Sequence, residues 1–538
     1  MSRTSRRELA IVVLFSLALL LPYAGGAYHI DEPFFLIQAR HILRDPLNPT
    51  GFSINCLGSL RPVSQAHAYP PLMPYLLAPS MALSGGSEWA MRLLNLPFDL
   101  LAACCLYLLA ARFLASPLLP ALIVLSCPAY FLDMRLLMAE KYLVALGLAG
   151  LYALVRGIED RRPPIYWASA VLLASAFMVK YSALCLIAAA LAYSWRKRVP
   201  PRRLALYAAL CVLPVAIFLG WGALSDTGRI ASVVNMAGSG AAALWSETAN
   251  KLRSLLAFIG GCGLVTVVWP FLTGRPGRRS WALAAVCAMA SVILFLPHLD
   301  SNPVRGVDRV MGVFLSGGAL LGLVETCRTS RGDGWWLWFA CLLCALALEA
   351  GPLWSISSRY VLLIVLPLIF ILAGVLEDRL SPATLRSVYA LSLLANVVFS
   401  SALLFVDSRY AQAQKDVAAL VAERYIFQGR RVWFAGHWGL QHYMEKAGAV
   451  ALDSERGGWA QALPGDVVVV PRVNSNFVRP RSPVLADTRI LEIACPVPLR
   501  LMSNTPDVQA GFYSNAFGFL PFALTREPVD VFSFVEIL

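Results

Sequence analysis

Two adjacent acids, Asp31 and Glu32, stand in the stretch "YHIDEPFF", directly after a long apolar run. Adjacent carboxylates repel each other, and near hydrocarbon they are costly to remove from water. A carboxylate held at such a boundary can take a proton from a substrate hydroxyl, which is general-base chemistry. The alternative is a solvated acidic pair whose negative charge favours the N-terminus of the helix predicted after it.

The composition indicates which class of protein must position these acids. The chain has 538 residues, of which 58% are apolar and only 14% are charged, and its mean hydropathy is +0.65. In a soluble protein, roughly a quarter of all residues are charged. Together with the repeated long apolar runs, this composition predicts a polytopic α-helical membrane protein.

The apolar runs predict about thirteen transmembrane helices. The first run follows a basic stretch, as in a signal peptide, but it reaches spanning length without a clear cleavage site, so we expect a retained helix. The predicted spans centre on residues 9–28, 88–111, 117–131, 141–155, 164–179, 181–195, 204–222, 254–272, 281–298, 310–326, 335–354, 360–376 and 387–406.

The distribution of Lys and Arg predicts the orientation. With the N-terminus in the cytoplasm, the short inner connections hold basic clusters such as "RKRVPPRR" at 196–203 and "GRPGRR" at 274–279. This bias follows the positive-inside rule through all the predicted spans. It also accounts for most of the net charge of +13, so we expect no nucleic acid partner.

The predicted topology divides the chain into a transmembrane part, residues 1–406, and an extracytoplasmic tail, residues 407–538. The tail combines a helical stretch, "SRYAQAQKDVAALVAERY", with the strand-like runs "RRVWFAG", "DVVVVPR", "RILEIACP" and "VDVFSFVEI". This mixture predicts a small soluble α/β domain of about 130 residues. Among the cysteines, Cys56 and Cys495 fall in outer segments, and a disulfide between them is left open.

The first outer loop, residues 29–87, contains the stretch "AHAYPPLMPYLLAP", which is typical of a helix lying in the membrane interface. An acidic pair after the first span, followed by a Pro-Pro-Leu element, resembles the GT-C glycosyltransferases. Within them it resembles the glycosyltransferase 39-like group, which includes protein mannosyltransferases and lipid A aminoarabinose transferases. "FMVKYSALCLI" at 177–187 and "SSRYVLLIVLPLI" at 357–369 are similar to that group's Lys-Tyr and Arg-Tyr elements.

The resemblance implies a fold and a reaction. It implies the GT-C fold in the bacterial inner membrane, with loop 29–87 as a catalytic loop on the outer face. These enzymes move a sugar from a polyprenyl-phosphate donor to a lipid, glycan or protein acceptor, and they invert the anomeric carbon. The resemblance makes Asp31 the base that takes the proton of the acceptor hydroxyl. Glu32 is expected to orient the acceptor or to tune this base.

The leaving group implied by the resemblance is a lipid phosphate, which needs cations near its oxygens. Residues at the predicted outer ends of spans could supply them, unless they only snorkel at helix ends. The candidates for donor phosphate binding are Lys180, Arg359, Tyr360 and Arg305.

Acids in the second outer loop, within "FLDMRLLMAEKY", are the candidates for holding the acceptor or a metal ion. Glu140 matches the position of an Asp in the family, and Asp133 is its rival; His67 in the first loop is a third candidate. The alternative for Glu140 is an interfacial salt bridge with Lys141 or Arg135. The candidate loop element consists of Tyr69, Pro70 and Pro71.

One departure from the family pattern bears on the substrate. Aminoarabinose transferases carry Glu-Lys before the Pro-Pro pair, whereas this chain has Ala68 and Tyr69. Aminoarabinose is therefore not the expected substrate, and a divalent metal ion is left open as a cofactor. The spacing of His437 and His442 matches no strong metal-ligand pattern, so both are interpreted as structural, and the tail is expected to cover the site or to bind the acceptor.

Two other functions are kept as alternatives. A transporter or flippase for a lipid-linked sugar would carry charged or broken helices at mid-membrane, or two related halves, and neither is evident in the sequence. A glycan ligase or polymerase that uses an undecaprenyl-diphosphate donor would share an outer-face site. The sequence has no glycine-rich phosphate loop after a strand, which argues against a nucleotide donor.

Overall fold

The structure is a computed structural model of the whole chain. It describes residues 3–66, 69–224, 248–273, 278–296, 303–329, 332–351, 353, 355–475, 477, 485–503 and 505–538. The candidate His67 lies outside the described residues, as do residues 225–247, which connect the spans predicted at 204–222 and 254–272.

Helices make up most of the fold. The first half contains α1 (Arg3–Leu20), α2 (Glu32–Ile42), α3 (Val63–Ala66), α4 (Leu72–Ser84), α5 (Glu88–Phe113), α6 (Leu118–Ser126), α7 (Pro128–Met134), α8 (Ala139–Glu159), α9 (Pro163–Val179), α10 (Leu184–Arg196) and α11 (Pro201–Leu224). The second half contains α13 (Thr248–Cys262), α14 (Val265–Thr273), α15 (Arg278–Leu294), α16 (Gly306–Arg328), α17 (Gly332–Ala350), α18 (Ser358–Arg379), α19 (Pro382–Arg424) and α20 (Trp438–Ala447).

Within the described residues, seven helices are long and apolar enough to cross a membrane: α5, α8, α11, α16, α17, α18 and α19. The helices α13 and α14 meet at a bend of 84° and would together count as an eighth span. The chain is thus a polytopic helical membrane protein, as predicted. The number of thirteen spans is not confirmed.

Several predicted spans are divided or shortened by their own residues. The span predicted at 117–131 forms α6 and α7, because Pro128 cannot donate the hydrogen bond that would continue the first helix. The span predicted at 181–195 becomes α10, which has 13 residues. Such a helix is about 20 Å long, whereas the hydrocarbon core is about 30 Å thick. Apolar composition therefore predicts these helices better than it predicts their length.

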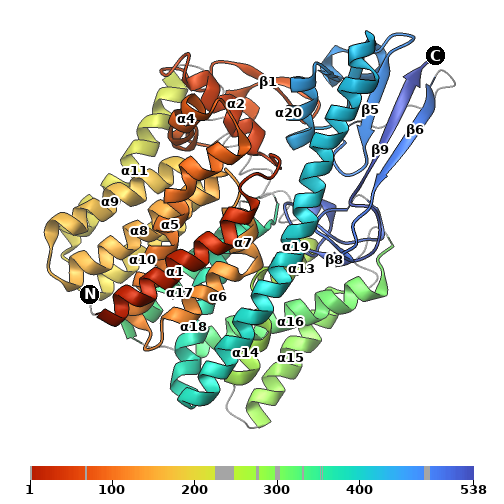
Figure 1. Cartoon of the computed structure of the whole chain (residues 1–538). Coiled ribbons are helices and arrows are strands. Elements are labelled where there is room, and N and C mark those ends of the chain that lie inside the picture. Colours follow the sequence, from red (N-terminus) through yellow and green to blue (C-terminus); the bar gives the residue numbers. More distant parts are fainter. Residues whose placement is uncertain are drawn as a thin grey trace.

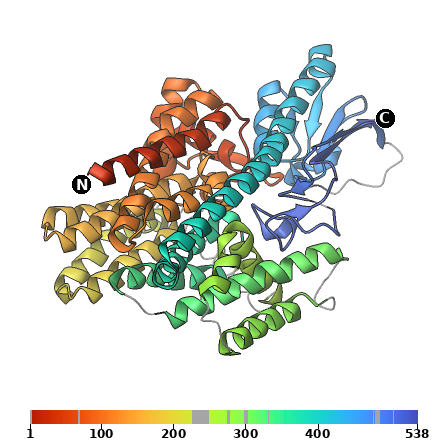
Figure 2. The same cartoon turned by 60° about the horizontal axis from the view of Figure 1, so that its bottom comes forward.

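The last predicted span and the predicted tail helix form one continuous helix, α19, of 43 residues. It begins after Ser381, whose hydroxyl oxygen accepts a hydrogen bond from the amide of Thr384 at 3.3 Å, and Pro382 occupies its first turn. Figures 1 and 2 show α19 running from the apolar helices to the C-terminal sheet. The predicted boundary after residue 406 therefore lies inside a helix.

The predicted tail strands are confirmed. A five-stranded sheet has the order β4 (Val450–Ala451), β3 (Val432–Phe434), β5 (Val467–Pro471), β9 (Asp530–Ile537) and β6 (Leu485–Ile493). β3 runs parallel to β4 and β5, and β9 runs antiparallel to β5 and β6. The β-branched valines of β5 suit a buried central strand. Two small antiparallel pairs are β1 (Ser53–Cys56) with β2 (Ser59–Pro62), and β7 (Leu499–Arg500) with β8 (Ala523–Leu524).

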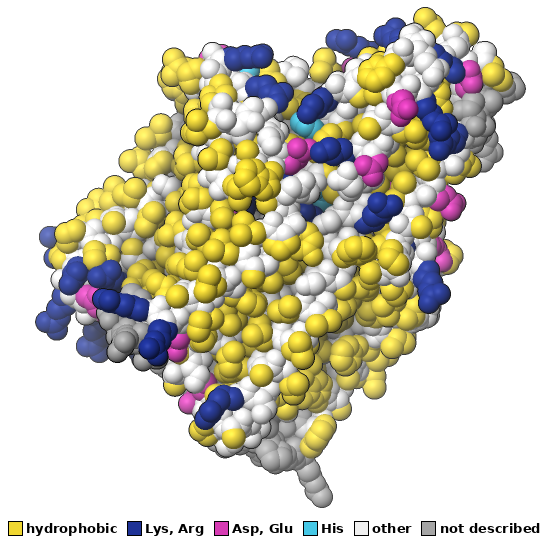
Figure 3. All heavy atoms as spheres, viewed as in Figure 1, with side chains coloured by type: hydrophobic (Ala, Val, Ile, Leu, Met, Phe, Trp, Pro, Cys, Tyr) yellow, Lys and Arg dark blue, Asp and Glu magenta, His cyan; other side chains and the backbone are white. Residues whose placement is uncertain are grey.

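The main hydrophobic core is continuous from the apolar helices into the tail. It contains Leu106 of α5 and Val365 of α18 together with Phe434 of β3 and Phe532 of β9. Figure 3 shows hydrophobic side chains over the broad middle of one face, with Lys and Arg gathered toward its ends. The tail is therefore packed against the helices through apolar contacts.

One buried carboxylate connects α19 with three other segments. Asp407 Oδ1 lies 3.0 Å from His29 Nε2, and its Oδ2 accepts hydrogen bonds from the Tyr513 hydroxyl at 2.9 Å and from the Arg135 guanidinium. All four side chains are buried. Because a buried charge is stable only when it is paired and hydrogen-bonded, these segments must assemble together.

Replacing this carboxylate tests the connection. In Asp407→Asn, Arg135 keeps its buried charge without its partner, so we expect the free energy of unfolding to fall by about 3–5 kcal/mol. Thermal unfolding of the detergent-solubilised protein, followed by intrinsic fluorescence, measures the loss.

The matched control is Asp416→Asn, the same change on the same helix, where the carboxylate accepts an exposed hydrogen bond from Gln412. Equal unfolding temperatures for the two variants would contradict the role of Asp407.

Candidate active site

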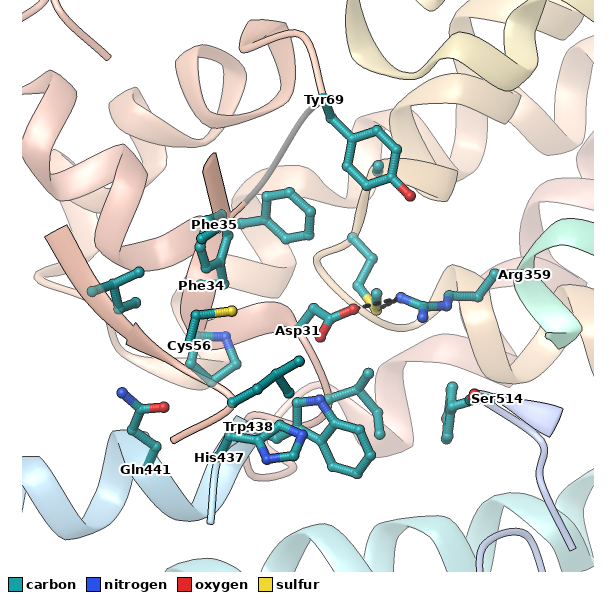
Figure 4. A pocket seen from close by; sticks show the side chains of 18 of the residues that line it. Asp31, Phe34, Phe35, Cys56, Tyr69, Arg359, His437, Trp438, Gln441 and Ser514 are labelled. Atoms are coloured by element: carbon teal, nitrogen blue, oxygen red, sulfur yellow. Dashed lines mark hydrogen bonds and ion pairs between the residues drawn. The ribbon is translucent and has the colours of Figure 1, made fainter. Parts of the chain in front are cut away.

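Asp31 lies at the N-terminus of α2 and lines a cavity of about 520 Å³. Its Oδ2 accepts a hydrogen bond of 2.8 Å from Nη1 of Arg359, at the start of α18. The Asp31 side chain is 39% exposed, so the carboxylate is accessible from the cavity. Figure 4 shows it pointing toward Arg359, with Tyr69 above it and Trp438 below it.

The backbone around this cavity is strained at three residues. Ile30, Leu57 and Trp438 all line the cavity, and their φ angles are 48°, 54° and 60°. A positive φ is an outlier for β-branched or bulky residues. Such conformations persist only where the surrounding structure imposes them, and they cluster at functional sites. Three of them around one cavity support its identification as the active site.

Glu32, the neighbour of Asp31, points away from the cavity. Both of its carboxylate oxygens lie 3.1 Å from Arg92 Nη2, and they also accept hydrogen bonds from the amides of Leu137 at 2.8 Å and His29 at 2.7 Å. Its exposed fraction is 0%. Glu32 is thus too buried to touch an acceptor; its hydrogen bonds tie the loop that presents Asp31 to α5 and to the segment between α7 and α8, and the expectation that it tunes the base stays a prediction.

Three of the four residues that the sequence suggests for phosphate binding, Lys180, Arg359 and Tyr360, line the cavity together with Asp31. Lys180, at the C-terminal end of α9, forms a buried ion pair with Glu140, and its Nζ lies 4.0 Å from the centre of the Tyr360 ring. The hydroxyls of Tyr69 and Tyr360 are 3.0 Å apart. Burial raises the pKa of Tyr69 well above its ordinary value, so its phenol stays protonated. This group of residues presents cations and hydroxyls to the cavity.

Two further candidates do not line the cavity. Asp133 is buried in α7, where it accepts a hydrogen bond of 3.1 Å from the Ser358 hydroxyl. Arg305 forms an ion pair of 2.8 Å with Asp308, three residues further along the chain. Arg305 therefore lies away from the cavity that holds Asp31, Lys180 and Arg359, and its position does not support the expected contact with the donor phosphate.

The Pro-Pro element acts through the backbone. Pro70 and Pro71 are buried and directly precede α4, and neither lines the cavity. A proline fixes its own φ and disfavours a helical conformation in the residue before it. Tyr69 is therefore held in a non-helical conformation at the cavity, which accounts for the element without a chemical role.

The tail supplies a wall of the cavity that the sequence interpretation treated as structural or did not name. We call these residues the tail wall: His437, Trp438, Gln441, His442, Tyr513, Ser514, Ala516 and Phe517. Burial lowers the pKa of both His437 and His442 to about 4, so both rings are neutral near pH 7. The prediction that the tail covers the site agrees with this placement.

Neither a metal site nor a disulfide is found among the described residues. In that part of the chain no group of three or more His, Cys, Asp or Glu side chains could hold a metal ion. Glu140 is paired with Lys180, and Asp31 with Arg359. The side chains of the described residues therefore do not fit a divalent ion. Cys56, which lines the cavity, and Cys495 are both free.

A comparison with protein families gives one match. Residues 68–221 match the model described as dolichyl-phosphate-mannose-protein mannosyltransferase. The matched segment contains Tyr69, Glu140 and Lys180 of the cavity, whereas Asp31 and Arg359 lie outside it. No curated protein sequence matches the chain.

Among solved structures, ArnT from Cupriavidus metallidurans in the apo state is similar at a TM-score of 0.44 and 15% identity, over 86% of this chain and 92% of that one. The oligosaccharyltransferase AglB from Archaeoglobus fulgidus is similar at 0.43 and 11%, over 87% and 69%. The arabinosyltransferase EmbB from Mycobacterium smegmatis is similar at 0.35 and 15%, over 94% and 49%. At these TM-scores the likenesses say nothing about the site.

The family match and the sequence motifs agree with each other. The match covers the Pro-Pro element and the Lys-Tyr element, and the acidic pair and the Arg-Tyr element flank it on either side. These elements are the ones that resemble the GT-C glycosyltransferases, and the family match agrees with that resemblance over residues 68–221.

Proposed function

We propose that the protein transfers a sugar from a polyprenyl-phosphate donor to an acceptor hydroxyl, with inversion at the anomeric carbon and Asp31 as the general base. The observation that carries the proposal is the ion pair of Asp31 with Arg359 in a cavity that also holds Lys180. A base and two cations at one cavity are what attack by a hydroxyl and departure of a phosphate require. The description of the matched family, with its dolichyl-phosphate donor, supports the donor class.

The cations divide the work on the leaving group. Arg359 has a planar guanidinium that can hold two phosphate oxygens, whereas Lys180 supplies a point charge. The hydroxyls of Tyr69 and Tyr360 add donors next to Lys180. Charge that develops on the departing phosphate is thus met by groups already in place, which lowers the barrier.

The ion pair also prepares the base. A guanidinium next to Asp31 favours the charged carboxylate, which is the form that can accept a proton. When a donor phosphate binds Arg359, it competes with the carboxylate for the guanidinium. Asp31 is then released toward the acceptor hydroxyl, so donor binding comes before proton transfer.

The proposed location is a bacterial inner membrane, with the N-terminus in the cytoplasm and the cavity on the outer face. The basic clusters at 196–203 and 274–279 support this orientation through the positive-inside rule. The proposed division is a transmembrane part at 1–406 and an extracytoplasmic tail at 407–538. The acceptor, whether lipid, glycan or protein, would reach the cavity from outside.

Asp31→Asn tests the base. The amide keeps the shape of the side chain but cannot take a proton, so we expect kcat to fall by about 10²–10⁴-fold. The measurement is transfer of radiolabel from polyprenyl-phosphate sugars in membranes that contain equal amounts of each protein. Near-normal transfer by the correctly inserted variant would exclude Asp31 as the base. Movement of intact donor across vesicles by both proteins would instead favour the transporter alternative.

Glu32→Gln is the neighbouring change with the opposite expectation. It removes the charge that neutralises the buried Arg92, so we expect it to lower the free energy of unfolding by about 3–5 kcal/mol. Thermal unfolding of both variants separates the two carboxylates. A stable Glu32→Gln protein combined with an unstable Asp31→Asn protein would reverse the roles.

Arg359→Ala tests donor binding. Hydrogen bonds to charged groups contribute about 1.5–3 kcal/mol, so we expect the KM for the lipid-linked sugar to rise by about tenfold or more. Steady-state transfer at varied donor concentration gives this value. The matched control is Arg44→Ala, an exposed arginine in the first loop, for which the KM should not change. A KM unchanged in both variants would remove Arg359 from the donor site.

A further inference from the structure

The cavity has two walls of different chemistry. The charged residues that line it, Asp31, Glu140, Lys180 and Arg359, all precede the tail. The tail wall offers only uncharged groups, because its two histidines are neutral near pH 7. A substrate in the cavity therefore meets cations where it lies against Arg359 and Lys180, and neutral side chains where it lies against Trp438 and its aromatic neighbours.

Trp438 is held on the tail wall at a cost in backbone energy. Its φ is 60°, in the left-handed region that favours glycine. The next residue, Gly439, lies so close to the first loop that an added Cβ would be 2.4 Å from the Tyr28 carbonyl oxygen. On the other side, the amide group of Asn474 donates a hydrogen bond to the carbonyl of His437 at 2.5 Å. The start of α20 is thus fixed from both sides.

The fixed backbone presents the indole to the cavity. The ring of Trp438 lies 4.5 Å from that of His437 and 5.9 Å from that of Phe517, so the three form an aromatic shelf. In Figure 4 the indole lies on the side of Asp31 opposite Tyr69. Strain of this kind persists only where the surrounding structure imposes it, and a glycine at this position would remove both the strain and the ring.

Resting on the proposed function, we propose that the acceptor is a glycan, and that an uncharged sugar residue of it stacks on Trp438 with its attacking hydroxyl toward Asp31. The C–H face of a pyranose packs on an aromatic ring, and its hydroxyls suit amide, hydroxyl and neutral imidazole groups. An anionic acceptor would find no cation on the tail wall.

The geometry also places the two substrates in order across the base. The donor phosphate meets Arg359 and Lys180, and the acceptor sugar meets the tail wall. Asp31 lies between them, so it can take the proton of the acceptor hydroxyl as the oxygen forms a bond to the anomeric carbon. The bond from that carbon to the phosphate oxygen breaks in the same step, and the lipid phosphate leaves with the electron pair.

Binding of neutral methyl pyranosides of glucose, galactose and mannose tests the proposal without any transfer. The protein carries Asp31→Asn, so that no donor is consumed, and saturation-transfer difference NMR in detergent reports the binding. We expect saturable binding of at least one glycoside and an increase in its Kd of about tenfold or more when Trp438→Gly is added. Glycine adopts a positive φ without strain, so we expect Trp438→Gly to keep the unfolding temperature of its parent. Weaker binding at an unchanged unfolding temperature is then due to loss of the ring and not to unfolding.

Two control variants sharpen the test. Trp438→Phe keeps an aromatic ring and should retain most of the binding. Trp89→Ala removes a tryptophan that is 59% exposed and does not line the cavity, and it should bind as before. Equal binding with and without Trp438 would overturn the proposal.

The same experiment distinguishes the other occupants of the tail wall. Glycoside binding should persist when polyprenyl-phosphate sugar is added, since the donor meets the opposite wall. If added donor abolishes glycoside binding, the aromatic shelf binds the donor sugar. If a neutral Ser/Thr peptide binds and no glycoside does, the shelf binds a protein acceptor. Either result overturns the proposal. Failure of Asp31→Asn to block transfer would overturn the proposed base alone, because glycoside binding does not depend on it.

Discussion

The buried carboxylate of Asp407 is the interaction on which the arrangement of this protein depends. It lies in the middle of α19 and receives His29 from the first loop, Arg135 from the segment between α7 and α8, and Tyr513 from the tail. None of these groups can be buried with its polar atoms unpaired without a large cost in free energy. The loop, the tail and the membrane helices therefore adopt their relative positions together, and the cavity forms where they meet.

Two neighbouring acids, Asp31 and Glu32, have different surroundings in this arrangement. Glu32 turns inward to the buried Arg92, and its remaining lone pairs accept backbone amides. Asp31, one residue earlier, lies at the N-terminus of α2, and its carboxylate is partly exposed. The strained φ of Ile30 accompanies this change of direction between successive side chains. The hydrogen bonds of Glu32 offset the cost in free energy of this strained conformation.

The charged residues of the cavity follow the same logic. Lys180, Glu140, Arg359 and Asp31 pair with one another, so each charge has a partner close to hydrocarbon before any substrate arrives. A phosphate can replace the carboxylate as the partner of the cation in such a pair, and a hydroxyl can replace the cation as the partner of the carboxylate. The described residues of the tail wall carry no charged side chain near pH 7, and in our proposal this wall meets the acceptor rather than the donor phosphate.

The sequence by itself determined the membrane class and most of the strands, because hydropathy and turn residues are local properties, and its short motifs indicated the resemblance to the GT-C glycosyltransferases. It also suggested Asp31, Lys180 and Arg359 as candidates through the family resemblance, and the structure brings these three residues to one cavity. Asp133 and Arg305 look equally suitable in the sequence, but a buried hydroxyl and a nearer acid engage them. Only the tertiary structure decided these partners, the number of long helices and the tail wall. The tail wall residues carry no motif, and they reach the cavity of Asp31 from more than 400 residues away in the sequence. Contacts between segments so distant depend on how whole helices pack, and no local pattern encodes them.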